Sequence, residues 1–336
     1  MTGESPTVSH ELRAGNFSLW MIASFLIPAA AFSLLPKVME PSGFVPLHNA
    51  VFAVSVAHGG LSGLFWIDRR YRRHLTENRT HSYGVPLAIL ACALIGVAIG
   101  GRTATLVIAA IYLGWTVIHF SRQNWGVLCL SASGLGAPRP STLELHGCNI
   151  AGVGAAIALA TAVLAEQRIP VAQWIWISSI GLLAAIVAFA LAAIAAVRQL
   201  RAKVQFRQIA LTLLVGTYFV PIFILDPFLG LTWVGVTHAI QYARIMWHVA
   251  ADQSQGNTIL RVAGMFASAG IYLIAFYVLR DGARWGLWAD VALVTLYSVV
   301  IWHFLLDARM FRLRDHAPRL ILQQSLPFLF RPRRAA

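Results

Sequence analysis

Four histidines lie within long apolar runs of the chain, where a polar side chain is costly if it faces lipid. They are His58, His119, His238 and His303. Such groups face the interior of a helix bundle or a cavity, and they commonly mark functional sites. Imidazole nitrogens are good ligands for iron, copper, zinc and nickel. Four imidazoles carried by separate segments therefore predict a metal site formed between helices.

Three polar side chains follow these histidines by three or four residues, which on a helix places each on the face of its histidine. They are Gln123, Gln241 and Asp307. A metal-bound imidazole usually donates its other N–H to an amide, carboxylate or carbonyl, so we expect these side chains to orient the rings. Asp307 also ends its apolar run, where a carboxylate opposes the helix dipole. His303, Arg309 or Arg312 could each supply its partner.

Further polar residues follow His238 in the same run. We predict that Tyr242 and Arg244 line a pocket beside the metal. His248 comes ten residues after His238 and faces roughly the same side, so its role stays open. The other six histidines lie in loops or at helix ends, and we expect none of them to bind the metal: His10, His48, His74, His81, His146 and His316.

The elements that must position these residues are helices that cross a bilayer. The 336 residues are 58% hydrophobic and only 12% charged, whereas a typical soluble domain is about a quarter charged. The apolar residues form runs close to the ~20 residues that span hydrocarbon as a helix. The sequence predicts an all-α polytopic transmembrane helical bundle with ten spans, at residues 17–35, 44–67, 84–100, 104–130, 147–165, 174–197, 208–225, 228–250, 259–279 and 287–306.

The Lys and Arg residues of the loops predict how this bundle is oriented in the membrane. With both termini cytoplasmic, and with Arg122 and Arg261 counted with the inner segments beside them, twenty Lys and Arg residues fall inside and five outside, and Arg244 is left within a span. Such a bias follows the positive-inside rule. The second, fourth, eighth and tenth spans, which carry the four histidines, then all run inward. At about 1.5 Å per residue, the histidines lie within one to two helical turns of a common depth.

This topology divides the chain into three parts. Residues 1–16 form a cytoplasmic segment, 17–306 the transmembrane domain and 307–336 a basic cytoplasmic tail. We expect the tail to lie on the anionic membrane surface through its arginines and Phe328–Phe330. The charges favour a bacterial-type inner membrane. The net charge of +13 is accounted for by topology, so nucleic acid is not an expected partner. Glycines such as Gly60 and Gly63 suit close helix contacts.

Four segments of the chain resemble, in order, motifs of the membrane carotene dioxygenases related to the bacteriorhodopsin-related protein. The segments are AHGGLSG (57–63), IHFSRQN (118–124), THAIQYARIMWH (237–248) and WHFLLDARMFR (302–312). Members of that family are multi-span helical proteins. They use histidine-bound ferrous iron and O2 to cleave β-carotene to retinal.

By this resemblance, the iron ligands would be His58, His119 and His238, while His303 matches the last motif and its metal role is our inference. The chain departs from the family pattern at Ser62, Asn124 and Tyr242, where the family has two acids and a second histidine, and at Asp307, which comes one residue early. The ligand set and the substrate therefore stay open.

The leading hypothesis is a membrane-embedded, histidine-ligated non-haem iron oxygenase. Fe(II) would be its cofactor, O2 its co-substrate, and its substrate a lipophilic molecule from the bilayer, such as a carotenoid, another isoprenoid or a lipid. The alternatives are a transporter or channel with a histidine-lined path, a b-type haem protein, and a non-catalytic membrane assembly factor. The sequence does not define a protein partner or an oligomeric state.

Overall fold

The chain folds into helices throughout the part that the structure describes. The computed structural model describes residues 6–38, 41–165, 171–225, 227–252, 257–282 and 287–330. The α-helices are α1 (Pro6–Val38), α2 (Pro41–Gly60), α3 (Leu64–Ile67), α4 (Arg69–Glu77), α5 (Val85–Leu135), α6 (Thr142–Ala165), α7 (Val171–Arg201), α8 (Phe206–Gly216), α9 (Val220–Ile224), α10 (Pro227–Ala250), α11 (Thr258–Gly282), α12 (Leu287–Met310) and α13 (His316–Ser325). Short turns of other helix types are η1 (Leu61–Gly63), η2 (Thr80–Gly84) and η4 (Pro327–Leu329).

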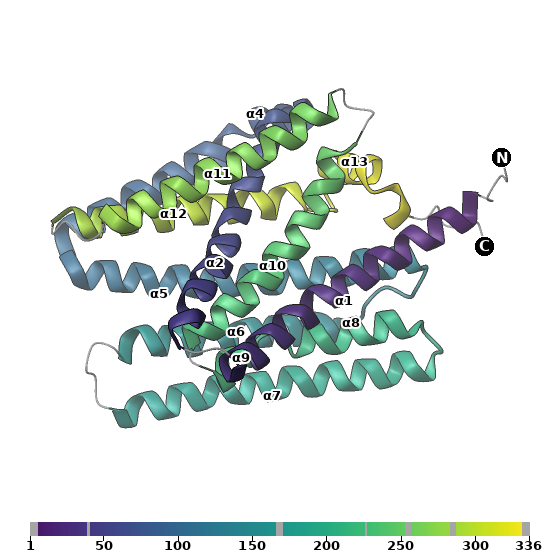
Figure 1. The fold of residues 1–336 in the computed structure, drawn as a ribbon, viewed down its shortest axis with the longest axis horizontal. Coiled ribbons are helices and arrows are strands. Elements are labelled where there is room, and N and C mark those ends of the chain that lie inside the picture. Colours follow the sequence, from purple (N-terminus) through teal and green to yellow (C-terminus); the bar gives the residue numbers. More distant parts are fainter. Residues whose placement is uncertain are drawn as a thin grey trace.

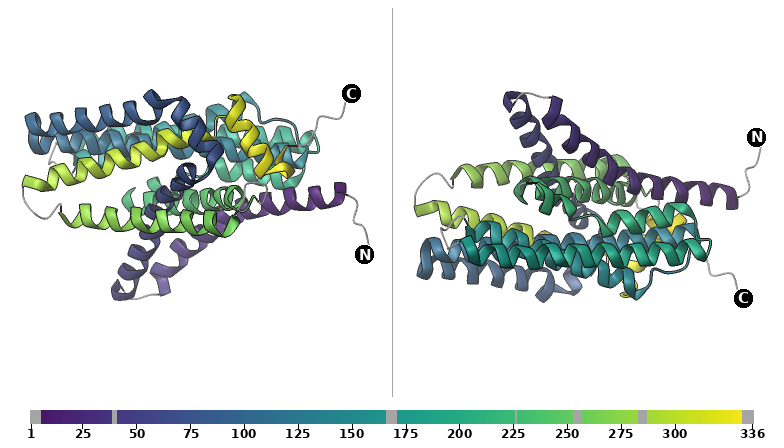
Figure 2. Two further views of the ribbon diagram at one scale, coloured as in Figure 1. Left: turned by 90° about the horizontal axis from the view of Figure 1, so that it is seen from above. Right: turned by 90° about the horizontal axis from the view of Figure 1, so that it is seen from below.

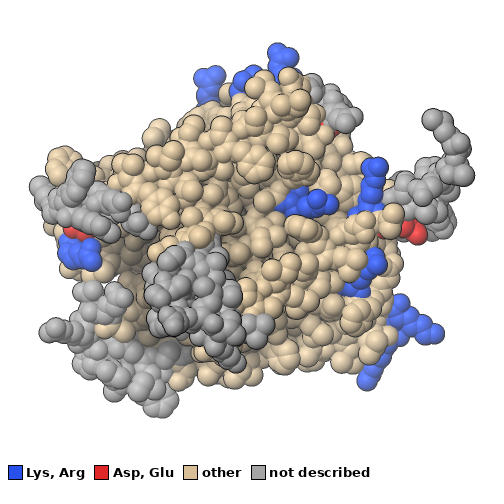
Figure 3. Space-filling model, in the orientation of Figure 1, with Lys and Arg blue, Asp and Glu red and all other residues tan. Residues whose placement is uncertain are grey.

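Seven helical stretches of the described chain are long and apolar enough to cross a membrane. Many of their outward side chains are large and apolar, including Ile99, Ile274 and Val278. In water such a surface would be unusually apolar, whereas hydrocarbon accommodates it. Figure 3 shows Lys and Arg mostly at the top and right of the molecule, the end that carries α4 and α13. Eight of the ten predicted runs each lie on one helix or on one half of α5, whereas 44–67 covers α2, η1 and α3, and 208–225 is divided between α8 and α9. The number of crossings stays a prediction.

Gly101 divides α5 into two helices that fold back on each other. Its backbone has φ +53° and ψ −135°, outside the helical region. Glycine adopts a positive φ without the steric cost that a Cβ atom imposes. Figure 1 shows the chain turning at the left edge and returning towards the right. Two of the predicted runs, 84–100 and 104–130, are therefore separate antiparallel helices despite a gap of only three residues.

The helices that carry the histidines meet in the interior of the bundle. α2 crosses between α10 and α11, while α12 packs along α5, and α6 packs between α5 and α7. Figure 2 shows α1 and α2 together on one face. A Cβ at Gly60 would lie 2.5 Å from the Cα of Ala269, and one at Gly63 would lie 2.3 Å from the Oγ of Ser268. As expected for small residues, these glycines let α2 and η1 approach α11 closely.

The tail packs on the helix bundle. Leu322 of α13 and Phe328 and Leu329 of η4 are buried. The Phe328 ring meets the Phe17 ring of α1 edge to face, with centroids 6.2 Å apart. The expectation that Phe328 and Leu329 contact the membrane surface is therefore wrong, because α1 and α5 already bury them. The role expected for the tail arginines stays a prediction. Residues 331–336, which hold three of the tail arginines, lie outside the described ranges.

A charged cluster ties the ends of several helices together at the basic end of the bundle. Asp68, directly before α4, accepts hydrogen bonds from Arg70 and, at 2.6 Å, from buried Arg261 at the start of α11. Arg70 also donates to Asp252, which accepts a hydrogen bond from Ser325 of α13. Burial alone would raise the pKa of Asp68, but Arg70 and Arg261 outweigh it and hold this pKa below the ordinary value.

Candidate metal centre

The structure brings the four predicted histidines together in the core. His58 comes from the end of α2, His119 from the second half of α5, His238 from the middle of α10, and His303 from α12. The ring centroid of His58 lies 4.6 Å from that of His238 and 5.1 Å from that of His303, and the His119 and His238 centroids are 5.1 Å apart. All four side chains are buried.

The spacing of the ring nitrogens fits shared coordination of one ion. The Nε2 atoms of His58 and His303 are 3.3 Å apart. One ligand atom each from His58, His238 and His303 lie within 4.8 Å of one another. Two nitrogens at ~2.1 Å from a common metal, in tetrahedral or octahedral geometry, are themselves about 3.0–3.4 Å apart. The three imidazoles therefore need only small movements to bind one cation.

Hydrogen bonds on the far side of two rings leave their inner nitrogens available. His58 Nδ1 bonds to the carbonyl oxygen of Ser55, and His303 Nδ1 bonds to the Oγ of Ser62 at 2.6 Å. When Nδ1 carries the proton and donates it, Nε2 of the neutral ring presents a lone pair. Both Nε2 atoms then face each other across the centre as acceptors, and this arrangement favours a metal ion between them.

Several buried polar atoms around the centre have no hydrogen-bond partner within the described part of the chain. They are Nε2 of His119, both ring nitrogens of His238 and Oδ2 of Asp307. Leaving a buried polar group unpaired costs about 1–3 kcal/mol, and most such groups in proteins are paired. A bound cation would satisfy such lone pairs: His238 could share one with His58 and His303, and His119 and Asp307 could share one with His303. The donor set therefore fits a metal.

Asp307 brings a carboxylate to the same centre. Its Oδ2 lies 3.4 Å from His303 Nε2 and 3.7 Å from His119 Nε2. Its Oδ1 accepts a hydrogen bond from the Tyr242 hydroxyl at 2.7 Å. Of the partners considered for this carboxylate, the structure places His303 next to it and adds Tyr242 and His119. A second possible ligand group, made of His119, His303 and Asp307, shares His303 with the first.

Ser62 connects the carboxylate, the tyrosine and one imidazole. Its Oγ lies 2.9 Å from the Tyr242 hydroxyl, 2.6 Å from His303 Nδ1 and 3.5 Å from Asp307 Oδ1. Sequence reasoning noted Ser62 only as a departure from a motif and did not predict this role. Its position four residues after His58, on the same helical face, is the signal that could have identified it.

The remaining predicted residues lie at the edge of the centre or outside it. Gln123 donates to the main-chain carbonyl of His238 at 3.3 Å and to the Gln241 side chain at 3.5 Å, so its contacts reach the backbone rather than an imidazole nitrogen. Arg244 faces α1, where its guanidinium lies 5.5 Å from the centre of the Trp20 ring. Arg244 therefore belongs to the α1–α10 contact and not to the pocket predicted for it. His248 packs against Phe328.

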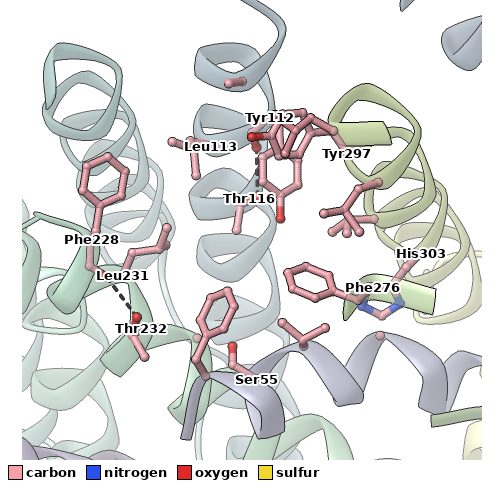
Figure 4. Close-up of a pocket in the computed structure, with 18 of the residues that line it drawn as sticks. Ser55, Tyr112, Leu113, Thr116, Phe228, Leu231, Thr232, Phe276, Tyr297 and His303 are labelled. Carbon is pink, nitrogen blue, oxygen red and sulfur yellow. Dashed lines mark hydrogen bonds between the residues drawn. The ribbon is translucent and has the colours of Figure 1, made fainter. Parts of the chain in front are cut away.

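An apolar cavity of about 890 Å³ opens beside the centre, with His58 and His303 in its wall. Figure 4 shows side chains from several helices pointing into it, including Phe276, Leu231 and the stacked rings of Tyr112 and Tyr297. A volume of this size suits a small-molecule ligand. Tyr242 lies on the other side of the centre and is not part of the cavity wall. The cavity therefore reaches the histidines from one side, and the Ser62–Tyr242–Asp307 network covers them from the other.

Comparisons of the chain with protein-family models, with curated proteins and with solved structures find no match. The resemblance carried by the four histidine segments accordingly stays a prediction from those segments.

Proposed function

We propose that the chain is a membrane-embedded non-haem iron oxygenase that acts on a lipophilic substrate. The observation that carries this proposal is the meeting of four imidazoles and one carboxylate, from segments far apart in sequence, at the end of an apolar cavity. Neutral imidazole with a carboxylate is a ligand set typical of non-haem ferrous iron. A purely structural role for the histidines would not require their unpaired nitrogens to face one another.

Each side chain of the centre has a role that follows from its contacts. His58, His238 and His303 would hold the ion through ring nitrogens, with His119 or Asp307 completing the set. When bound, ferrous iron would supply the redox chemistry that lets O2 react with an unsaturated hydrocarbon. Ser62 and Tyr242 hold Asp307 and the His303 ring in place. Their hydrogen bonds fix the orientation of the ring before substrate arrives.

The cavity would supply the substrate and exclude water. Its wall is formed mainly by apolar and aromatic side chains, such as Phe120, Leu296 and Phe304. An apolar wall favours a substrate that partitions into the bilayer, and a bound apolar molecule displaces water from the reacting centre. The substrate class therefore includes carotenoids, other isoprenoids and lipids.

Iron analysis combined with oxygen uptake tests the proposal. Protein purified in detergent and supplied with Fe(II) without oxygen is expected to retain about one iron per chain. It should then consume O2 when an isoprenoid or carotenoid is added, and a chelator should abolish both signals. Iron that stays at background after reconstitution, or uptake that persists after chelation, would contradict the assignment. Zinc supplied in place of iron is the control for metal binding without redox chemistry.

Substitution of Ser62 by alanine is expected to weaken metal binding without removing a ligand. The change deletes the hydrogen bond to His303 Nδ1 and one partner of Tyr242. Loss of such a supporting bond typically lowers metal affinity about 10- to 100-fold. Competition with a chromogenic chelator measures this affinity. Ser298→Ala is the matched control, since Ser298 is a buried serine of α12 whose hydroxyl donates to the Val294 carbonyl oxygen of its own helix.

Substitution of Leu113 by tryptophan is expected to block substrate but not metal. Leu113 lies in the cavity wall, away from the histidines, and the larger ring would fill space that the substrate needs. Turnover should fall at least about tenfold, equivalent to ~1.4 kcal/mol, with iron content unchanged. Ile111→Trp is the control, because Ile111 points outward from the same helix. Equal activity of the two variants would show that the cavity does not hold substrate.

A further inference from the structure

The cavity is a long slot that follows one face of α5. Its wall takes from this helix Arg102, Thr105, Tyr112, Thr116 and Phe120, among others. Eighteen residue steps separate the first from the last, which is about 27 Å of helix. The cavity of about 890 Å³ is therefore elongated along the helix. An elongated cavity of this kind suits a ligand with an extended chain.

Three threonines in the wall of the slot have hydroxyl groups that are bonded to their own helices. The hydroxyls of Thr105, Thr116 and Thr232 each donate to the carbonyl oxygen four residues earlier on their own helix. These threonines therefore present mainly methyl groups to the cavity. Tyr112 and Tyr297 stack with ring centroids 4.5 Å apart at an interplanar angle of 19°, which forms a flat aromatic surface. A chain lying here would be held mostly by apolar contact.

The end of the slot away from the histidines carries charge. Arg102 lies in the cavity wall there, and its side chain is 65% exposed. It donates through Nη1 to Asp290 at 3.3 Å. A guanidinium has five N–H donors, so most of them stay free of any partner in the described residues. The guanidinium of Arg102 can therefore bind a second anion besides Asp290, because arginine binds carboxylate and phosphate in a bidentate manner.

We propose that the substrate is an amphiphile with one extended chain and one anionic head group, and that Arg102 binds the head. This inference rests on the proposed function for the identity of the reacting end. Asp290 and His303 lie thirteen residues apart on α12, which is about 20 Å. An extended chain advances ~3.5 Å for every three bonds, so the carbon beside the metal lies about 17 bonds from the head group. Arg102 is then a residue that determines which chains bind and where they react.

Binding to metal-free protein tests this inference separately from the oxygenase assignment. The probes are a fluorescent conjugated polyene carboxylic acid of about 18 carbons, its methyl ester, and an alkyl phosphate of the same length used as a competitor. Chelator-treated protein in nanodiscs of zwitterionic lipid should bind the acid about tenfold more tightly than the ester. Competition by the phosphate distinguishes a general anion site from one selective for carboxylate. Equal affinity for acid and ester would overturn the inference.

Two substitutions on the same ion pair should have opposite effects. Arg102→Ala is expected to weaken acid binding about tenfold, while Asp290→Asn removes a competing anion and should strengthen it several-fold. Arg102→Lys should restore part of the affinity, and ester binding should stay constant. Arg139→Ala, at an exposed loop arginine, is the control. If both variants of the pair weaken binding alike, the pair is structural only. If head-group binding holds while iron never binds, the oxygenase assignment fails and the anionic-ligand site stands.

Discussion

Replacing His303 with alanine is expected to reduce the iron bound to the purified protein by more than about tenfold, because loss of a supporting hydrogen bond alone has an effect of that size. His303 belongs to both possible ligand groups, and its Nε2 lies 3.3 Å from that of His58 and 3.4 Å from Asp307 Oδ2. No other described residue is common to both groups. Iron content by mass spectrometry and oxygen uptake measure the loss.

Alanine variants of other histidines test whether the loss of iron is specific to residues of the centre. His58→Ala and His238→Ala should each reduce iron, and His81→Ala should not, since His81 is exposed on η2. His119→Ala separates the two ligand groups, because His119 occurs in only one of them. Thermal unfolding of each variant identifies any that fail to fold. Normal iron content in folded His303→Ala protein would exclude a metal centre at this position.

Replacing Asp68 with alanine is expected to destabilise the protein by about 3 kcal/mol. The change leaves Arg261, which is 5% exposed, without the carboxylate that it contacts at 2.6 Å. Removing one partner of a buried ion pair typically costs ~3–5 kcal/mol. The lower value applies because Arg261 also donates to the carbonyl oxygens of Asp252 and Val249. The midpoint of thermal unfolding in detergent, followed by circular dichroism, measures the change.

The pH dependence of stability provides a second measurement on Asp68. The pKa of Asp68 lies below its ordinary value in the folded protein, so the ionised form favours folding. Its contribution is complete above the unfolded pKa of about 3.9 and is lost as pH falls through the lower folded pKa. The wild type should therefore lose stability towards acid more steeply than Asp68→Ala. Glu77→Ala, in the exposed Arg73–Glu77 pair, is the control and should shift the midpoint little. Equal midpoints for Asp68→Ala and Glu77→Ala would contradict this prediction.

The positions of the helices and the meeting of the histidines could be predicted from the sequence, because a bilayer constrains the length of each helix and the depth of each residue along it. A spanning segment must be helical and of a certain length, so apolar runs locate the helices. Depth along a helix follows from residue count, which placed His58 and His303 at a similar level. The turn at Gly101 was predicted from a short polar interval between two apolar runs. That its φ of +53° makes the reversal possible is visible only in the structure.

The sequence did not predict how each helix is rotated about its axis or which side chains make contact across the bundle. Ser62, Tyr242 and Asp307 come from three distant segments, and a single sequence does not show which faces of those segments meet. Arg244 was assigned to the pocket because it follows His238 closely, but six residues turn it by about 240° to another face. Phe328 was assigned to lipid because an apolar group in a basic tail has the same pattern whether it contacts a membrane or α1.

The long separation of the ligands along the chain has a consequence for biosynthesis. His58 and His303 are 245 residues apart, so at ~5–20 residues per second the ribosome needs about 12–50 s to make the segment between them. Until α12 has been inserted, the nascent chain contains three of the imidazoles and lacks Asp307. If the proposed centre binds a metal, its loading would therefore be a post-translational event, in which the cell delivers the ion to an already inserted protein.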